Sequence, residues 1–156
     1  MLLRIREYPE PVLREQTKRI YKISSAIEEL AASMMTIMKK HNGVGLAAPQ
    51  VGQAIKLAVV NTVGHIPDKE EFADDTGFNG ALINPSIESS EGTIAIQEGC
   101  LSFPGLEVAV PRAAKIVVAY TDIYGRDTVS TFTGFTAIVV QHELDHLNQK
   151  LFIDYD

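Results

Sequence analysis

The segment from about residue 134 to residue 148 limits the possible folds of this chain more than any other part of the sequence. In a helix, its apolar residues would cover most of the circumference: Phe135, Ile138, Val139, Leu144 and Leu147. A helix that is apolar on nearly all sides has to be buried by the rest of the chain. We therefore predict a central helix with the other elements wrapped around it.

A second helix is predicted from about Ser25 to His41. Its apolar residues recur at intervals of three or four positions, which indicates one buried face. Ser25 and Glu28 fit a capping box at its start, and Asn42 with Gly43 is typical of a helix end. Its methionines are expected to pack in the core.

Short apolar stretches separated by Gly, Pro, Asn and Asp are typical of strands. They lie at residues 57–61, 81–83, 92–96, 106–110, 115–121 and 128–132. With two helices and no repeat, they predict an α+β fold: small antiparallel or mixed sheets around the central helix. The acidic stretch from Gly64 to Gly80 is expected to be a solvated loop, because its carboxylates do not have the spacing of a calcium-binding loop.

The composition excludes several classes of protein. The 156 residues suit a single domain, and 14 Lys and Arg against 20 Asp and Glu give a net charge of −6, which argues against nucleic acid or an anionic membrane as partner. A lone cysteine, Cys100, cannot form an internal disulfide. No apolar run reaches the roughly 18 residues of a membrane span, and the amino terminus lacks a signal-peptide pattern. The chain is expected to be soluble, reduced and cytoplasmic.

The predicted central helix carries a histidine pair. His142 and His146 stand four residues apart, so both imidazoles project from the same face of a helix and can bind one ion. Glu143 lies about 100° around the helix from His142, near such an ion. Buried imidazoles without partners cost ~1–3 kcal/mol each, and a metal ion would provide the partner. The pattern therefore predicts a metal site.

Two histidines do not complete a catalytic metal site, which uses three protein ligands and one open position. The candidates for the third ligand are Cys100, His41, His65, Asp145 and more distant carboxylates. Cys100 follows an apolar strand, and Gly99 before it permits a tight backbone path. A thiolate with two imidazoles suits zinc or ferrous iron, and the residue types alone leave both metals open.

The segment Gly43–Gly52 has a different character. Its glycines permit a sharp bend or the close approach of another backbone, and without further context the segment indicates a turn after the helix. It is not a phosphate-binding loop, since it lacks the Lys-Ser/Thr ending and follows no strand. Gln50 is an uncharged donor and acceptor in an apolar context, and it is suited to holding a carbonyl oxygen.

Three segments together resemble the three motifs of the peptide deformylase family: Gly43–Gln50, Glu98–Ser102 and Gln141–His146. The resemblance spans nearly the whole chain and implies a short bacterial-type form in which residues 1–156 are a single catalytic domain. It implies that Cys100, His142 and His146 bind one divalent metal, usually ferrous iron, with zinc or nickel also able to bind. It further implies that Glu143 is the catalytic glutamate and that Gln50 and the backbone N–H of Leu101 polarise the formyl oxygen.

The activity that the resemblance implies is the removal of the N-formyl group from N-formylmethionyl peptides of nascent proteins, with release of formate. Gly45 would pair with the substrate backbone, which would extend beside residues 44–46 and 105–107. The methionine side chain would enter an apolar pocket with His142 at its base. That pocket would be lined by Val44, Ile96, Phe135, Ile138 and Val139.

Two departures from the commonest bacterial pattern are visible. Many relatives continue into a carboxy-terminal helix that helps them dock on the ribosome, whereas this sequence stops at Asp156, so the ribosome is left open as a partner without that mode of docking. Many relatives also carry an arginine that contacts the peptide soon after the cysteine motif, where this chain has Gly105-Leu106-Glu107, so that contact is either missing or replaced, with Arg112 as the candidate.

Two alternatives remain open at this point. One is a metallopeptidase that uses the same histidine pair without needing Cys100 or Gln50. The other is a non-catalytic peptide-binding domain with a structural metal, although a structural site needs four protein ligands and the sequence offers no convincing fourth.

Overall fold

Two antiparallel sheets and two α-helices make up the structure, a computed structural model that describes residues 2–155. The five-stranded sheet has the order β1-β2-β3-β6-β7, and β4 and β5 form a separate two-stranded sheet. The predicted α+β fold class is confirmed. The strands are β1 (Gly45–Ala47), β2 (Leu57–Asn61), β3 (Asn79–Glu91), β4 (Ile94–Cys100), β5 (Phe103–Arg112), β6 (Lys115–Thr121) and β7 (Asp127–Thr133). The helices are α1 (Ser25–Lys40) and α2 (Gly134–Leu147), with the 3₁₀ helices η1 (Pro11–Arg14), η2 (Ala48–Val51), η3 (Glu70–Phe72) and η4 (Phe152–Tyr155).

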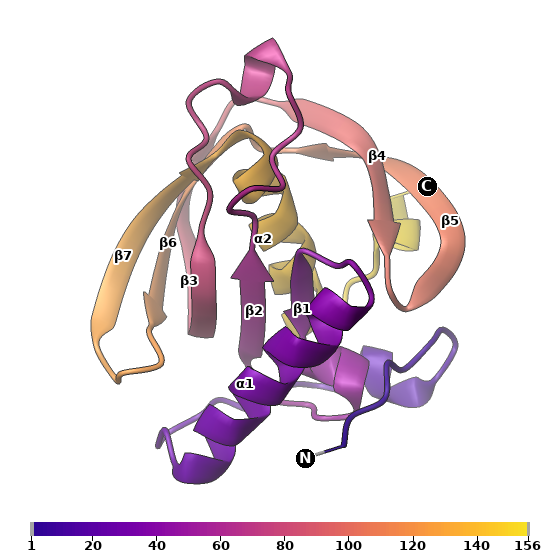
Figure 1. Cartoon of the computed structure of the whole chain (residues 1–156), viewed down its shortest axis with the longest axis vertical. Coiled ribbons are helices and arrows are strands. Elements are labelled where there is room, and N and C mark those ends of the chain that lie inside the picture. The colour runs from indigo at the N-terminus through magenta and orange to yellow at the C-terminus, as the bar shows by residue number, and fades with distance from the viewer. Residues whose placement is uncertain (1, 156) are drawn as a thin grey trace.

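Helix α2 lies between the two sheets, as Figure 1 shows, and the prediction of a buried central helix is confirmed. Its apolar side chains pack against the five-stranded sheet in a cluster that includes Leu82, Ile116 and Phe132. Its polar side chains His142 and His146 are buried as well, and α2 contacts β4. Although α2 is strongly apolar, no helix within residues 2–155 is both long and apolar enough to cross a membrane.

Helix α1 packs its methionine-bearing face against β1 and β2, as predicted. Met34 and Met38 are fully buried in this second cluster. The helix begins at Ser25, as predicted, but the predicted cap is wrong by one residue: Ser24 is the N-cap, and its side chain accepts a hydrogen bond from the backbone N–H of Ile27. Ser24 and Ser25 carry the same side chain, but only a residue with an extended backbone can act as the N-cap. The sequence does not reveal which of the two has that backbone conformation.

Two segments contain more strand than their sequences predict. β3 runs for 13 residues, not just through residues 81–83, and its exposed second half pairs with β6 after irregularities in register near Ser86 and Ile87. The segment 43–52, expected to be a turn, contains β1 and η2. In both cases pairing with a neighbouring strand sets the backbone conformation, and the local apolar pattern does not report it.

Arg14 and Asp154 join the first and last 3₁₀ helices in a two-pronged ion pair. The guanidinium nitrogens Nη1 and Nη2 lie 2.6 and 2.8 Å from the carboxylate oxygens. The hydrogen bonds from Arg14 lower the pKa of Asp154 to about 2. A carboxyl whose pKa is lowered by folding stabilises the folded state above its unfolded pKa, and this contribution is lost as the pH falls through the folded value.

Asp154→Asn is therefore expected to lower the free energy of unfolding by up to about 1 kcal/mol at neutral pH, because the pair is partly exposed. The difference from the parent protein should shrink as the pH falls from about 4 towards 2. Denaturant unfolding of both proteins over this pH range measures it, with the exposed Asp74→Asn as control. A difference that is independent of pH would contradict the assignment.

Candidate active site

Three predicted metal ligands from distant parts of the chain meet beside α2. The ligand atoms of Cys100, His142 and His146 all lie within 4.8 Å of one another, and the sulfur of Cys100 is 3.5 Å from Nε2 of His146. Cys100 is the last residue of β4, so the pairing of β4 with β5 brings it to the helix. The other histidines that were candidates, His41 and His65, are exposed and do not join this group.

These residues fit a divalent metal ion. The ligand atoms of both imidazoles and the thiol lie within 4.8 Å of one another, and Nε2 of His146 faces the sulfur of Cys100. In His142, Nδ1 lies 3.0 Å from Glu98, which leaves Nε2 free to ligate. A ligating histidine characteristically donates its other ring N–H to a carboxylate in this way. One sulfur and two nitrogens are the donors that zinc and ferrous iron accept.

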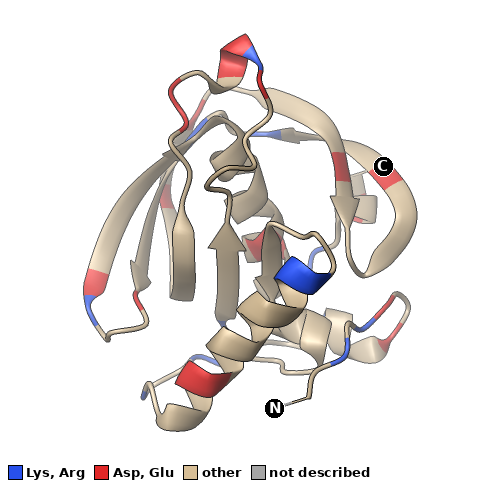
Figure 2. Ribbon diagram, in the orientation of Figure 1, with Lys and Arg blue, Asp and Glu red and all other residues tan. Residues whose placement is uncertain are grey.

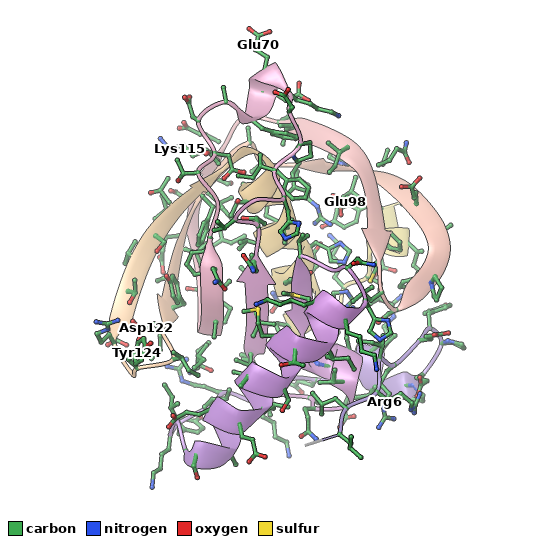
Figure 3. All side chains as sticks on the ribbon, viewed as in Figure 1. Arg6, Glu70, Glu98, Lys115, Asp122 and Tyr124 are labelled. Carbon is green, nitrogen blue, oxygen red and sulfur yellow. The ribbon has the colours of Figure 1, made fainter. Side chains whose placement is uncertain are left out.

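A buried ion pair between Arg112 and Glu98 holds His142 in place through Glu98. Glu98 accepts hydrogen bonds from Nε and Nη2 of Arg112 at 2.9 and 2.8 Å, in addition to its contact with His142. Figure 3 shows Glu98 on β4, beside α2. Burial by itself would raise the pKa of Glu98, but the hydrogen bonds from Arg112 and His142 bring it below its usual value. Glu98 therefore stays ionised and fixes the ring orientation of His142.

The prediction that Arg112 replaces a peptide-contacting arginine is wrong. Its side chain is only 3% exposed, and besides Glu98 it donates to Asp145 at 2.6 Å. Asp145, a candidate ligand from sequence, is engaged by Arg112 and by the hydroxyl of Tyr155 instead of the metal group. Arg112 and Glu98 are both buried, and an unpaired charge in the interior is costly. Arg112 therefore pairs with Glu98 and does not reach a peptide at the surface.

Glu143 is buried beside the three ligands. Its Oε1 has no hydrogen-bond partner in the described chain, and its other oxygen faces Gly45. Burial raises the pKa of Glu143 to about 7. A carboxylate with a pKa near neutrality is suited to accept and return a proton at physiological pH.

Gln50 presents a donor to the site. Its Oε1 accepts from the backbone N–H of Ala47 at 2.9 Å, so Nε2 is left to donate, to Ser102 at 3.1 Å and towards the sulfur of Cys100 at 3.5 Å. The sequence predicted that Gln50 donates to a carbonyl oxygen, and this geometry leaves its Nε2 as the donor on the side of the site. The sequence indicated no individual role for Glu98 or Ser102. Their position in the same short motif as Cys100 was the only available signal.

A cavity of about 510 Å³ opens beside these groups. The structure places every residue predicted for substrate binding on its wall: Val44, Gly45, Ile96, Phe135, Ile138 and Val139. Gln50, Leu101 and Glu143 also line it, together with Cys100 and His142. The wall includes residues that the sequence did not indicate, among them Ile5, Glu7 and Pro104, and it includes His41, which is not one of the three clustered ligands. One apolar cavity thus adjoins one cluster of polar groups, the arrangement typical of an active site.

Comparison with known proteins identifies the family. The profile of the family described as "Polypeptide deformylase" matches residues 2–155. The chain belongs to this family. It is 40% identical to the peptide deformylase of Endomicrobium trichonymphae, over 98% of this chain and 85% of that protein. It is 41% identical to that of Dictyoglomus thermophilum, over 99% and 92% respectively.

Solved structures of the same family share the fold. The peptide deformylase of Legionella pneumophila matches with a TM-score of 0.88 and 36% identity, over 100% of this chain and 86% of that one. That of Thermotoga maritima matches with a TM-score of 0.86 and 35% identity, over 99% and 97%. The resemblance seen in the sequence is confirmed. The chain is an enzyme of a metal-dependent family that removes the N-formyl group from nascent peptides, and neither alternative from the sequence has support.

Gly45→Ala is expected to lower the rate of deformylation by about 10²-fold, because small displacements of a reacting group are costly. A Cβ at Gly45 would lie 2.5 Å from Oε2 of Glu143 and 2.9 Å from Val139, so the carboxylate would have to move. The measurement is formate release per bound metal. Ser89→Ala, at an exposed position of β3 away from the cavity, is the control expected to stay active. Full activity in Gly45→Ala would show that the position of Glu143 is not critical.

Proposed function

We propose that the chain performs deformylation of N-formylmethionyl peptides with one divalent metal held by Cys100, His142 and His146. Ferrous iron is the proposed native ion, with zinc or nickel able to take its place. When bound, such a metal polarises the formyl carbonyl and makes water more acidic. The observation that carries the proposal is the meeting of these three donors beside the buried carboxylate of Glu143, whose Oε1 has no hydrogen-bond partner within residues 2–155.

Glu143 moves the proton in this proposal. It accepts a proton from the attacking water while the water oxygen bonds to the formyl carbon. It then donates that proton to the leaving nitrogen as the carbon–nitrogen bond breaks, which yields formate and a free amino terminus. Its pKa of about 7 suits both steps, because a group that gains and loses a proton in one cycle works best when its pKa is near the ambient pH.

Two N–H groups stabilise the charge that grows on the formyl oxygen. Nε2 of Gln50 is directed to this side of the cavity because its carbonyl is held by Ala47. The backbone N–H of Leu101, the residue after Cys100, is the second proposed donor, and Leu101 lines the same cavity. Preorganised donors of this kind typically contribute ~2.7–4 kcal/mol each to lowering a barrier.

The apolar part of the cavity accepts the methionine side chain, between Phe135, Ile138 and Val139 of α2 and Val44 and Ile96. The peptide backbone extends along β1, which is the edge strand of the five-stranded sheet. Gly45 lies on this strand and also lines the cavity. Pairing with an edge strand binds a peptide through its backbone and leaves the later side chains unselected.

Residues 1–156 act as one catalytic domain in this proposal, since the ligands come from Cys100 in the middle of the chain and from His142 and His146 near its end. We place the enzyme in the cytoplasm. The substrate is a nascent peptide, and a ligating thiolate has to stay reduced, as cytoplasmic thiols are.

Metal analysis and formate release from formyl-Met-Ala-Ser test the function, with protein prepared anaerobically so that a ferrous thiolate centre survives. One bound metal ion, formate release and no turnover of acetyl-Met-Ala-Ser are expected, because a methyl group would crowd the site of the formyl oxygen. Cys100→Ala should lose the metal. Bound metal without formate would overturn the activity, and cleavage after methionine would favour a peptidase.

A further inference from the structure

The loop of residues 62–78 joins β2 to β3 and lies near the first turn of α2 (Figure 1). Figure 2 shows its tip rich in acidic residues, and Glu70 in Figure 3 projects outward from it. The prediction of a solvated loop from this composition is correct for the tip only. Phe72 is 3% exposed, and Asp75 is half-buried. Phe72 and Asp75 therefore face the protein, and both contact the start of α2.

Asp75 caps α2 from outside the helix. Thr133, the N-cap residue, makes no side-chain capping bond. Instead Oδ2 of Asp75 accepts a hydrogen bond of 2.7 Å from the backbone N–H of Thr136 in the first turn. First-turn N–H groups have no partner within a helix, and a negative charge beside them is favourable. A residue 61 positions away in the sequence thus performs the task that the local N-cap leaves undone.

A chain of hydroxyl groups ties the same residue into the sheet. A carboxylate only accepts, so Thr136 must donate its hydroxyl to Asp75, at 2.8 Å. The hydroxyl of Thr62 must then donate to that of Thr136, at 2.6 Å, while it accepts from the backbone N–H of Phe78 at 3.0 Å. Each donor in this series makes one hydrogen bond. The series connects both ends of the loop to the first turn of α2.

Phe72 supports the cavity wall from behind. Its ring centre lies 5.9 Å from that of Phe135, at an interplanar angle of 59°. A Cβ at Gly134 would lie 3.1 Å from Cδ1 of Phe72 and 3.3 Å from Cβ of Asp75, so the loop is packed closely on this glycine. Phe135 lines the cavity, whereas Phe72 does not. Phe72 can therefore influence a substrate only through Phe135.

We propose that Phe72 and Asp75 are positioning residues that set the width of the cavity for the first side chain of the peptide. They do so by holding Phe135 and the first turn of α2 in place, and the slender, unbranched side chain of methionine is preferred over a bulky aromatic one as a result. The inference rests on the proposed function, in which this cavity accepts the first side chain. It assigns the acidic loop a role in selectivity.

The first test compares two substrates, formyl-Met-Ala-Ser and formyl-Phe-Ala-Ser, in Phe72→Leu. Removing the ring behind Phe135 widens the cavity, and the ratio of kcat/KM for the two peptides is expected to fall by about 10-fold, within the range that one hydrophobic contact contributes to discrimination. The change should appear chiefly as a higher KM for the methionine peptide. The kcat should stay within about 2-fold, because Gly45 and Glu98 still hold the reacting groups.

Phe78→Leu is the matched control for this variant. Phe78 belongs to the same loop, and its ring contacts Tyr120 and Phe132. The variant loses the same ring atoms, but Phe78 does not line the cavity, so the substrate ratio should equal that of the parent protein.

The second test replaces the cap. Asp75→Ala should lower the substrate ratio in the same direction and speed hydrogen exchange in the first turn of α2. Asp75→Asn should restore much of both, because its carbonyl oxygen can still accept from the N–H of Thr136. Asp74→Ala removes the same charge from an exposed neighbour and should change neither quantity.

The outcomes separate the two proposals. Variants of Phe72 and Asp75 that lose thermal stability but keep the parental substrate ratio would overturn the role in selectivity and leave deformylation intact. Parent protein with bound metal that releases no formate from either peptide would overturn the proposed function, and this inference with it.

Discussion

Glu143→Gln is expected to lower the rate of formate release by about 10²- to 10⁴-fold, the usual contribution of a positioned general base. The amide has the shape of the carboxylate but cannot take a proton from water. The measurement is kcat for formyl-Met-Ala-Ser at equal metal content. Metal binding should persist, because the three ligand atoms belong to Cys100, His142 and His146.

Folding should not suffer in this variant. Burial raises the pKa of Glu143 to about 7, so above that pH the folded state holds a charge that its surroundings disfavour, and a neutral side chain removes this cost. Glu15→Gln, at an exposed position, is the control and should keep full activity. Formate release at the parental rate from Glu143→Gln would show that another group moves the proton.

Arg112→Met is expected to lower the free energy of unfolding by about 3–5 kcal/mol, because it leaves the buried carboxylate of Glu98 without its main partner. The same variant should weaken metal binding by about 10- to 100-fold, since Glu98 orients the ligand His142. Denaturant unfolding of the metal-free protein and metal titration measure the two effects separately.

The exposed arginine at position 126 provides the control for this prediction. Arg126 pairs with Asp122 at 2.9 Å, but its side chain is 71% exposed, so Arg126→Met should cost less than about 1 kcal/mol. Adding Glu98→Gln to Arg112→Met should recover part of the lost stability, because no unpaired charge then remains. Equal, small losses from Arg112→Met and Arg126→Met would contradict the importance of the buried pair.

The metal ligands show which part of the site helical periodicity can predict. Helical spacing alone places His142 and His146 on one face, and the structure shows both buried on α2. The third ligand is different, because spacing between Cys100 and the histidines carries no information about distance in space. Its choice from among five kinds of candidate came from a resemblance to a family, and the structure brings its sulfur to the imidazoles through the β4–β5 pairing.

The sequence reveals least about the structural roles of the charged residues. Arg112 and Glu98 look like ordinary surface charges in the sequence, and both are nearly inaccessible in the structure. Asp75 lies among several acidic residues that resemble one another, and only it accepts from the first turn of α2. A charged side chain takes its role from the partner it meets, and that partner can lie anywhere in the chain.

The order of residues by itself determined that a strongly apolar helix must be buried, that it presents two imidazoles on one side, and that short strands surround it. Those properties depend on residues at most a few positions apart in the sequence, which local backbone geometry relates directly. Only the tertiary structure decided that the sulfur of Cys100 reaches the imidazoles, that Oε1 of Glu143 has no hydrogen-bond partner within residues 2–155, and that the loop of residues 62–78 caps the helix. Such contacts link residues dozens of positions apart, and their distances depend on how all the strands pair at once.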